Sequence, residues 1–317
     1  MTHAAMREPA LADQLATPLT VADPDRVGTL CVFPLIADRA PTLDYVAFAE
    51  GRRRGVAIKE LAAGAEVGEL VVHNPLELPV LFYEGEEIHG AQQNRTVDIS
   101  VLVAAESTLR VPVSCVEQGR WDHRRHQESF APAPQAAYPE LRRLKNERVR
   151  ERLAAGEAPR AAQGEVWREI AAKSARHGAR SDTGALHDVF EHRRELIERA
   201  GREIEMKGSQ VGMLAAIGGR FVVLDYVSDV AAFAALHDPL VAGYALDALE
   251  PDTRDASAPS LEDAREFLAL LLDAPTHAGA AVGQGETLRF GFGGLVGTAL
   301  ASDGELVALT AFAGKAG

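Results

Sequence analysis

Residues 69–113 read ELVVHNPLELPVLFYEGEEIHGAQQNRTVDISVLVAAESTLRVPV. Short apolar runs rich in β-branched and aromatic residues recur here, and turn residues such as Asn74-Pro75 and Gly85 separate them. Successive parallel strands need a long, usually helical connection, and this stretch has no room for one. The sequence therefore predicts antiparallel β-structure and excludes a Rossmann-type first half.

Strand patterns extend to both sides of this stretch. A hairpin is predicted around Gly218-Gly219, a pair that readily adopts the positive φ of a tight turn. The predicted strands are 30–35, 56–61, 69–73, 80–84, 97–103, 109–113, 211–217, 221–226, 287–292, 295–300 and 305–312.

Three helices are predicted between 139 and about 206. Pro139 suits the first turn of the first helix, and the second helix ends at Gly178. The third begins near Ser181 or Thr183 and keeps its apolar residues on one broad face as far as Ile204.

Two further helices are predicted in the C-terminal half. One covers about 231–249 and is interrupted or begun at Pro239, and the other opens at Ser260 with Asp263 three residues on.

The expected fold class is α+β, with an antiparallel β-rich core and a helical excursion over about 139–206. Residues 1–27 lack a clear period and are expected to form a loosely ordered arm. Residues 28–317 are expected to form a single domain, with 139–206 as a helical insertion.

Composition and charge limit the function classes. The formal net charge of −13 and pI of about 5.3 repel a phosphate backbone, so no nucleic-acid partner is expected. The two cysteines, Cys31 and Cys115, are too few for a disulfide framework and fit a reducing compartment. No apolar run has the length of a signal peptide or a membrane span. We therefore expect a cytoplasmic protein without a membrane partner.

The segment Tyr83–Arg95 is the densest group of functional side chains. Glu84, Glu86 and Glu87 lie close together, and crowded carboxylates repel one another, which raises the pKa of at least one of them. Such a segment is either one side of a ligand site or a solvated acidic turn. The amides of Gln93 and Asn94 and the guanidinium of Arg95 follow and favour a site.

The second candidate segment is Val111–Trp121, where a strand runs out into glycine and tryptophan. Cys115 is either a nucleophile or a buried structural cysteine, because a reactive thiol needs a neighbour that lowers its pKa. Glu117 adds a carboxylate and Trp121 an aromatic face.

Metal ligation is not predicted. His123 and His126 have the spacing of a half-site, but no matching second half follows, and neither an HExxH nor a phosphate-binding loop motif occurs. We therefore expect neither a cofactor nor a bound metal ion.

The runs PVLFYEGEEIHGAQQNRTVDISVLV and RVPVSCVEQGRW resemble the ARG and Rhodanese-Phosphatase-superfamily-associated Protein domain family. The later runs QVGMLAAIGGRFVVLDYVSD and GYALDALE resemble the same family, so the likeness covers about 29–313. The resemblance implies an association with ADP-ribose chemistry and no established activity. The residues here that match its polar motif are Glu84, Gly85, Glu86, Gln93, Asn94, Arg95, Cys115, Glu117 and Trp121.

Two functions remain open. The first is a site for an ADP-ribose-like or other sugar-phosphate ligand, with hydrolytic chemistry in which Glu84, Glu86 or Glu117 acts as acid or base. Arg95 would hold an anionic group, beside a lining formed by Cys115.

In the same site, Gln93 and Asn94 would bind sugar hydroxyls and Trp121 would stack on the ligand.

The second function is a non-catalytic binding or regulatory module, in which the polar loop braces Arg95 against Glu84 or Glu117. The helices of 139–206 would then offer the surface for a protein partner.

Overall fold

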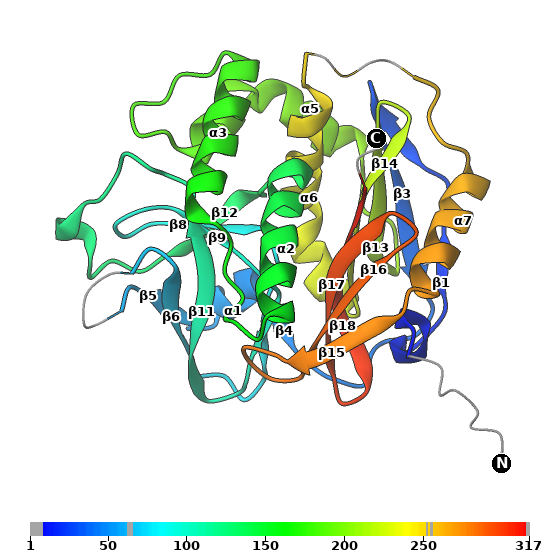
Figure 1. Ribbon diagram of the computed structural model, residues 1–317, viewed down its shortest axis with the longest axis horizontal. Coiled ribbons are helices and arrows are strands. Elements are labelled where there is room, and N and C mark those ends of the chain that lie inside the picture. Colours follow the sequence, from blue (N-terminus) through cyan, green and yellow to red (C-terminus); the bar gives the residue numbers. More distant parts are fainter. Residues whose placement is uncertain (1–8, 62–65, 252, 254–255, 315–317) are drawn as a thin grey trace.

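The computed structural model describes residues 9–61, 66–251, 253 and 256–314. Its strands form three sheets, and the pairings between described strands are antiparallel except that of β4 (Val46–Ala47) with β7 (Val80–Phe82). Helices lie between and outside the sheets (Figure 1). The fold is α+β, as the sequence predicted.

The largest sheet has nine strands. Their order is β1 (Leu19–Val21), β3 (Leu30–Ala37), β13 (Gln210–Ile217), β14 (Arg220–Val227), β18 (Glu305–Ala313), β17 (Leu295–Ser302), β16 (Glu286–Phe292) and β15 (Thr276–Ala280), with β2 (Asp25–Val27) also paired to β3.

This sheet is buried on both faces, because α6 (Val230–Ala248) covers one and α7 (Leu261–Leu272) the other. Neighbouring strand residues point to opposite faces. Val32 joins the core of Phe233 on α6, whereas Phe33 joins the core of Leu268 on α7. Two covered faces explain why the central strands are continuous apolar runs without alternation.

The other half of the molecule contains two smaller sheets. The six-stranded sheet has the order β12 (Ala131–Ala136), β8 (Glu86–His89), β9 (Arg95–Val97), β11 (Ser107–Cys115), β6 (Glu69–Asn74) and β5 (Ala57–Lys59). The three-stranded sheet has the order β10 (Val101–Val103), β7 (Val80–Phe82) and β4 (Val46–Ala47). A separate core, which includes Phe82, Val97 and Val113, holds them together.

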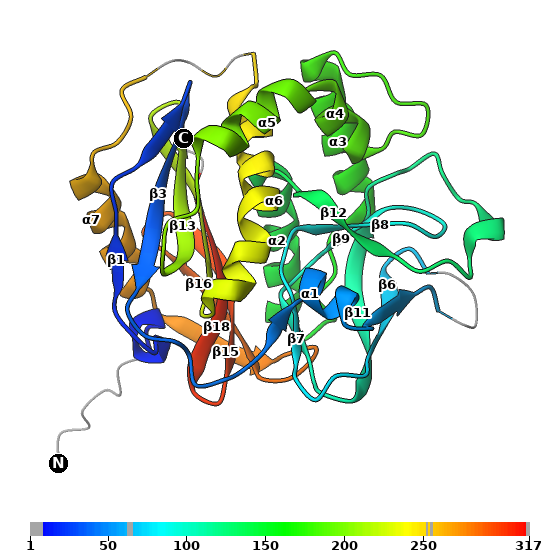
Figure 2. The same ribbon diagram turned by 180° about the vertical axis from the view of Figure 1, so that it is seen from behind.

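The helical excursion packs on the β-structure. It consists of α2 (Pro139–Ala154), α3 (Gln163–His177), α4 (Leu186–His192) and α5 (Arg194–Glu203), and α1 (Phe48–Arg53) and the 3₁₀ turns η1 (Leu11–Gln14) and η2 (His123–Arg125) complete the described helices. Helix α2 contacts β17 and α6, and α3 contacts β11. Figure 2 shows α6 between the large sheet and the smaller ones.

The described part of the expected N-terminal arm is ordered. Leu11 is fully buried, and β1 pairs with β3 in the register Leu19 to Ala37. Strand β1 is three residues long, which is too short to show a period in the sequence. Residues 1–8 lie outside the described part of the chain.

Two helices differ from their predicted form. The helix expected from about Ser181 to Ile204 is broken at Arg193, whose guanidinium bonds the ring and the carbonyl of His177 on α3. Helix α6 runs through Pro239 without a break, because buried residues on both sides of the proline, such as Leu236 and Leu240, pack it in place and outweigh the lost hydrogen bond. None of the helices in the described ranges is both long and apolar enough to cross a membrane.

Candidate functional site

The two polar segments lie side by side. Strand β9 pairs with β11 in the register Arg95 to Cys115, and the amide of Val116 donates to the carbonyl of Asn94. The turn after β8 therefore meets the loop after β11 at one end of the six-stranded sheet.

Glu84 belongs to a buried ionic network. Arg142 of α2 donates from Nε to Glu84 Oε2 at 3.0 Å and from Nη1 to Asp225 Oδ2 at 2.9 Å. The hydroxyl of Tyr83 donates to Asp225 at 2.7 Å. Burial raises the pKa of Glu84, against the opposing charge of Arg142. This placement supports a structural role for Glu84, with Arg142 rather than Arg95 as its partner.

Gly85 is required by the same network. Its φ is +88°, and a Cβ there would lie 2.4 Å from Nε of Arg142. No side chain fits unless Arg142 moves, so the turn and helix α2 are in direct contact through this glycine.

Glu86 is buried, and no described residue forms an ion pair with it. Its Oε2 accepts a hydrogen bond from the amide of Tyr83 at 2.6 Å. Burial raises its pKa to about 8. The expected neutral acid is therefore present, but desolvation rather than carboxylate crowding causes it.

Glu87 and His89 form a hydrogen-bonded pair that sequence reasoning left without a role. Glu87 Oε1 lies 2.8 Å from His89 Nε2, and the imidazole is 24% exposed. Gln135 of β12 donates to Glu87 Oε2 at 2.9 Å and also contacts His187 of α4. Burial alone would lower the pKa of His89, but Glu87 outweighs it and the pKa is raised.

Arg95 is fully buried, and only part of its guanidinium is paired. Nη1 donates to Gln93 Oε1 at 3.0 Å, whereas Nε and Nη2 make no hydrogen bond with a described residue. The carboxylate of Glu60 forms an ion pair with this group, with its Oε1 3.7 Å from Nη2, which is too far for a hydrogen bond. Trp121 covers the group with its ring centre 5.9 Å from the guanidinium carbon.

Burial shifts the pKa values of both Arg95 and Glu60. It lowers the pKa of Arg95, partly offset by neighbouring groups that include Glu60. It raises the pKa of Glu60, against the opposing charge of Arg95. Nε and Nη2 form the edge of a guanidinium that grips carboxylates and phosphates through two parallel bonds.

Glu117 joins the two segments to the helical excursion. It pairs with Arg120 at 2.6 Å, accepts the amide of Asn94 at 3.2 Å and accepts the hydroxyl of Thr183 at 3.1 Å. Burial would raise its pKa, but Arg120 outweighs that and the pKa lies below its ordinary value. Gly119 makes this approach possible, since a Cβ there would lie 2.9 Å from the Thr183 backbone.

Cys115 has the surroundings of a structural cysteine. It is fully buried, and Gln163 of α3 bonds both its amide and its carbonyl at 2.8 Å. Burial raises the pKa of the thiol, against the charge of Arg95. The environment therefore favours the protonated, unreactive form.

The predicted amides are already bonded within the protein. Gln93 donates to the carbonyl of Glu117, and Asn94 Oδ1 accepts from Arg120. Trp121 is 36% exposed. His126 contacts Gln92, and the ring of His123 packs on Trp121, so neither lies in a group with His89.

Sequence reasoning missed several side chains of this site. They are Glu60, Arg120, Gln135, Thr183 and His187. Glu60 had a local signal, a single carboxylate at the end of an apolar strand. Gln135 and His187 had none, because only tertiary packing brings β12 and α4 to β8.

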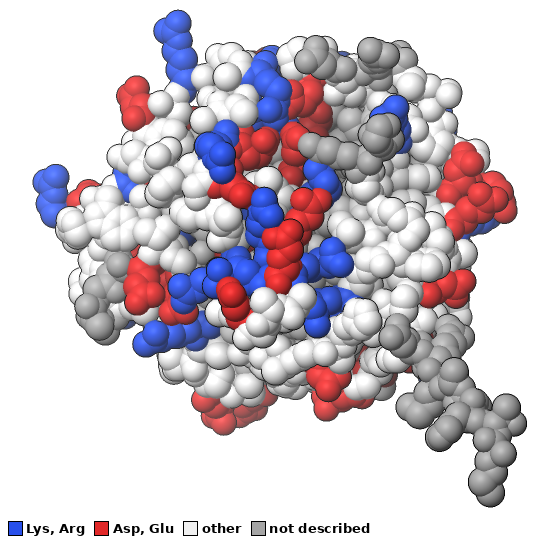
Figure 3. All heavy atoms as spheres, in the orientation of Figure 1, with Lys and Arg blue, Asp and Glu red and all other residues white. Residues whose placement is uncertain are grey.

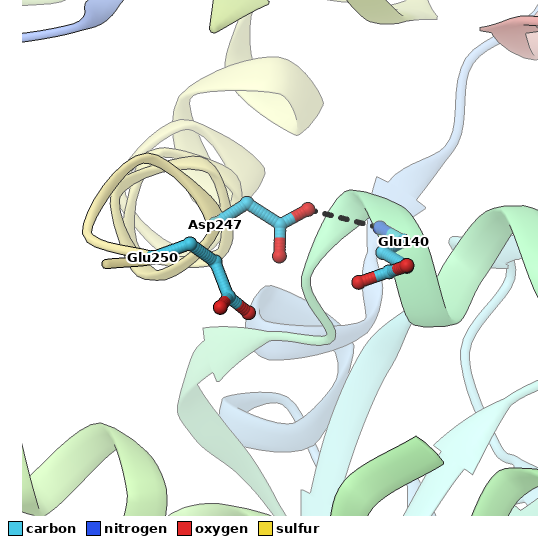
Figure 4. A group of neighbouring side chains, drawn as sticks. All are labelled: Glu140, Asp247 and Glu250. Atoms are coloured by element: carbon cyan, nitrogen blue, oxygen red, sulfur yellow. Dashed lines mark hydrogen bonds between the residues drawn. The ribbon is translucent and has the colours of Figure 1, made fainter. Parts of the chain in front are cut away.

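A second cluster offers ligand atoms for a cation. Glu140, Asp247 and Glu250 have carboxylate oxygens within 4.8 Å of one another (Figure 4). The ammonium of Lys173 already lies among them, 2.6 Å from Asp247 and in an ion pair with Glu250. Asp247 also accepts the amide of Glu140 at the start of α2. This cluster therefore joins the ends of three helices, beside a cavity of about 850 Å³.

On the face shown in Figure 3, the charged side chains of the helical surface do not form a patch of one sign. Acidic and basic side chains lie next to one another over α2 and α3. Arg143 pairs with Glu147 at 2.6 Å and Arg148 with Glu165 at 2.8 Å.

Comparisons with known proteins give one result. A family model described as the ARG and Rhodanese-Phosphatase-superfamily-associated Protein domain matches residues 18–312. Neither a curated protein nor a solved structure matches the chain.

Proposed function

We propose a ligand-binding function for this chain, which belongs to the ARG and Rhodanese-Phosphatase-superfamily-associated Protein domain family. The ligand is a small molecule with a phosphate or carboxylate group, of the sugar-phosphate or ADP-ribose-like class. The observation that carries the proposal is the guanidinium edge of Arg95, which is buried and whose Nε and Nη2 make no hydrogen bond with a described residue.

Buried N–H groups without a hydrogen bond are rare because each one costs about 1 to 3 kcal/mol, so such an edge is expected to have a hydrogen-bond partner. An anion that bonds Nε and Nη2 together would satisfy it. In this proposal Gln93 fixes Nη1 and thereby orients the edge, while Trp121 stacks on the body of the ligand.

The raised pKa of Glu60 is compatible with an anion beside it. A protonated Glu60 can donate a hydrogen bond to a phosphate or carboxylate oxygen, whereas an ionised one would repel it. In this proposal Glu60 takes up a proton as the ligand binds.

The alternative is a structural module, and the 3.7 Å approach of Glu60 to Arg95 favours it. There, Glu60 closes on the guanidinium and the pair braces β5 against β9. The two alternatives differ in what conservative substitution does.

The test uses Arg95→Lys, with Arg110→Lys on the exposed part of β11 as the matched control. Binding of ADP-ribose, ribose 5-phosphate and inorganic phosphate is measured by calorimetry and by thermal shift. We expect Arg95→Lys to weaken binding at least about tenfold, because lysine loses the two-bond edge, and to change stability by less than about 1 kcal/mol.

Arg110→Lys should bind like the wild-type protein. Failure of all probes to bind, together with a loss of roughly 3 kcal/mol in the stability of Arg95→Ala, would instead establish the structural alternative.

A further inference from the structure

Two arginines from distant parts of the chain meet where α2 lies against the large sheet. Arg150 belongs to the C-terminal half of α2, and Arg289 is the middle residue of β16. Helix α2 contacts β17, the neighbour of β16 in the sheet (Figure 1). A helix and a strand therefore each bring one guanidinium group to this place.

A hydrogen bond between Asn146 and Thr298 fixes α2 over these strands. Nδ2 of Asn146 donates to Oγ1 of Thr298 at 3.0 Å. Thr298 pairs with Arg289 in the register of β17 with β16, so these two side chains lie side by side on one face of the sheet. Arg150 follows Asn146 by four residues and therefore lies on the same face of α2. The contact thus directs Arg150 toward β16.

Gly291 leaves the room that the guanidinium of Arg150 occupies. It follows Arg289 by two residues, so its side-chain position lies on the same face of β16. A Cβ at Gly291 would lie 2.8 Å from Nη2 of Arg150, which is closer than Cβ atoms pack. The guanidinium of Arg150 therefore rests on the strand beside Arg289.

The two guanidinium groups have no partner within the described ranges. Neither Arg150 nor Arg289 forms a hydrogen bond or an ion pair with a described residue, and Nε of Arg150 is buried. The acids within electrostatic range of Arg150 are Glu147 and Glu151, and both are in ion pairs with other arginines of α2. Two positive charges are therefore in excess here.

These two positive charges repel each other. Burial, and after it the charge of Arg289, lowers the pKa of Arg150. Both side chains are half-buried, so solvent screens the repulsion only in part. An anion bound between the guanidinium groups would replace the repulsion with two attractions.

We propose that Arg150 and Arg289 form a second anion site, which binds the phosphate monoester group of a small molecule. A phosphate monoester carries about −1.5 to −2 charges at pH 7, which matches two guanidinium groups. A single carboxylate would leave one of the two cations unbalanced. The planar guanidinium also suits phosphate oxygens, because it can donate two parallel hydrogen bonds.

This site is separate from the proposed site at Arg95. Arg95 lies on β9 of the six-stranded sheet, whereas Arg289 lies on β16 of the nine-stranded sheet. The inference therefore does not rest on the proposed function. The ligand is a small molecule rather than a nucleic acid, because the formal net charge of −13 repels a polymer of phosphates.

The test is calorimetric titration of inorganic phosphate into the full chain at about 0.15 M NaCl, which screens non-specific attraction. The same titration of the Arg95→Lys variant counts the two proposed sites separately. Arg150→Gln and Arg289→Gln should each weaken phosphate binding at this site at least about tenfold, because one of its two guanidinium groups is lost. Circular dichroism checks folding, and Arg289→Gln decides if Arg150→Gln does not fold.

Arg265→Gln is the matched control, because it changes the net charge by the same amount. This arginine of α7 is 53% exposed and forms an ion pair with Glu262. Its replacement should leave the phosphate Kd within about twofold. Acetate is the second probe and should bind at least about tenfold more weakly than phosphate, because it carries a single charge.

Three results overturn the inference. The first is the same titration for the wild-type protein, Arg150→Gln and Arg289→Gln, including the absence of binding in all three. The second is a loss of affinity in Arg265→Gln as large as that in Arg150→Gln, and the third is equal affinity for acetate and phosphate. Binding that Arg95→Lys leaves intact and Arg150→Gln weakens supports this site, whatever the outcome for the proposed function.

Discussion

At the scale of single residues, Glu86 shows how burial alone sets a protonation state. Its carboxyl accepts one amide hydrogen bond from Tyr83, and burial raises its pKa from 4.5 to about 8. Between these values the folded protein keeps a proton that the unfolded chain releases. The folded state is therefore stabilised below this pH window, and that stability is lost as pH rises through it.

Glu86→Gln mimics the protonated acid at every pH. When the pH rises from 5 to 8, we expect the free energy of unfolding of the variant to increase by roughly 2 to 4 kcal/mol relative to that of the wild-type protein. Urea denaturation at both pH values measures this gain. Glu77→Gln, an exposed site, is the control and should show no such gain. An equal effect of pH on the Glu86 variant and the wild type would mean that Glu86 is ionised in the folded state.

At the scale of elements, Arg142 joins α2 to two β-structures. Its guanidinium bonds Glu84 after β7 and Asp225 on β14, and the hydroxyl of Tyr244 on α6 also donates to Asp225. All of these groups are buried. Removal of Arg142 would leave two buried carboxylates without their ion-pair partner.

Arg142→Ala should therefore destabilise the protein by about 3 to 5 kcal/mol, measured by urea denaturation. Arg143→Ala is the control, because that neighbour pairs with a partly exposed Glu147 and should cost at most about 1 kcal/mol. Similar losses of stability for the two variants would show that the buried network contributes no more to stability than a partly exposed ion pair.

The elements also show what local sequence can predict. Gly218 and Gly219 both have positive φ, and they form the hairpin turn between β13 and β14. The capping box of Ser260 with Asp263 begins α7 as predicted. Strands β8 and β12 were not predicted, because EEIH is polar and APAPQA carries two prolines. Pairing with neighbouring strands, rather than propensity, makes them strands.

At the scale of the whole molecule, some residues of the site can be predicted from the sequence and others cannot. The pairing of β9 with β11 joins two segments that are polar and close in the chain, and these were predicted together. Glu60 reaches Arg95, and His187 reaches His89, through tertiary packing, which no local pattern encodes. The residue set was therefore only partly predictable, and the buried state of Glu84 and Arg95 was not predictable.

The arrangement of histidines leads to a prediction about metals. Purified protein should carry no stoichiometric zinc or iron, because His89, His123 and His126 have different partners and Lys173 lies among the carboxylates of the acidic cluster. Elemental analysis measures this. One tightly held equivalent that is lost on replacing His89 or His126 would contradict the prediction.

The central claim is that the buried edge of Arg95 binds an anion, and a crystal structure of the protein with inorganic phosphate tests it most directly. The account predicts phosphate density with oxygens at about 2.7 to 2.9 Å from both Nε and Nη2, in the standard two-bond geometry. Density that instead shows the Glu60 carboxylate bonded to both nitrogens, with no phosphate beside Trp121, would contradict it.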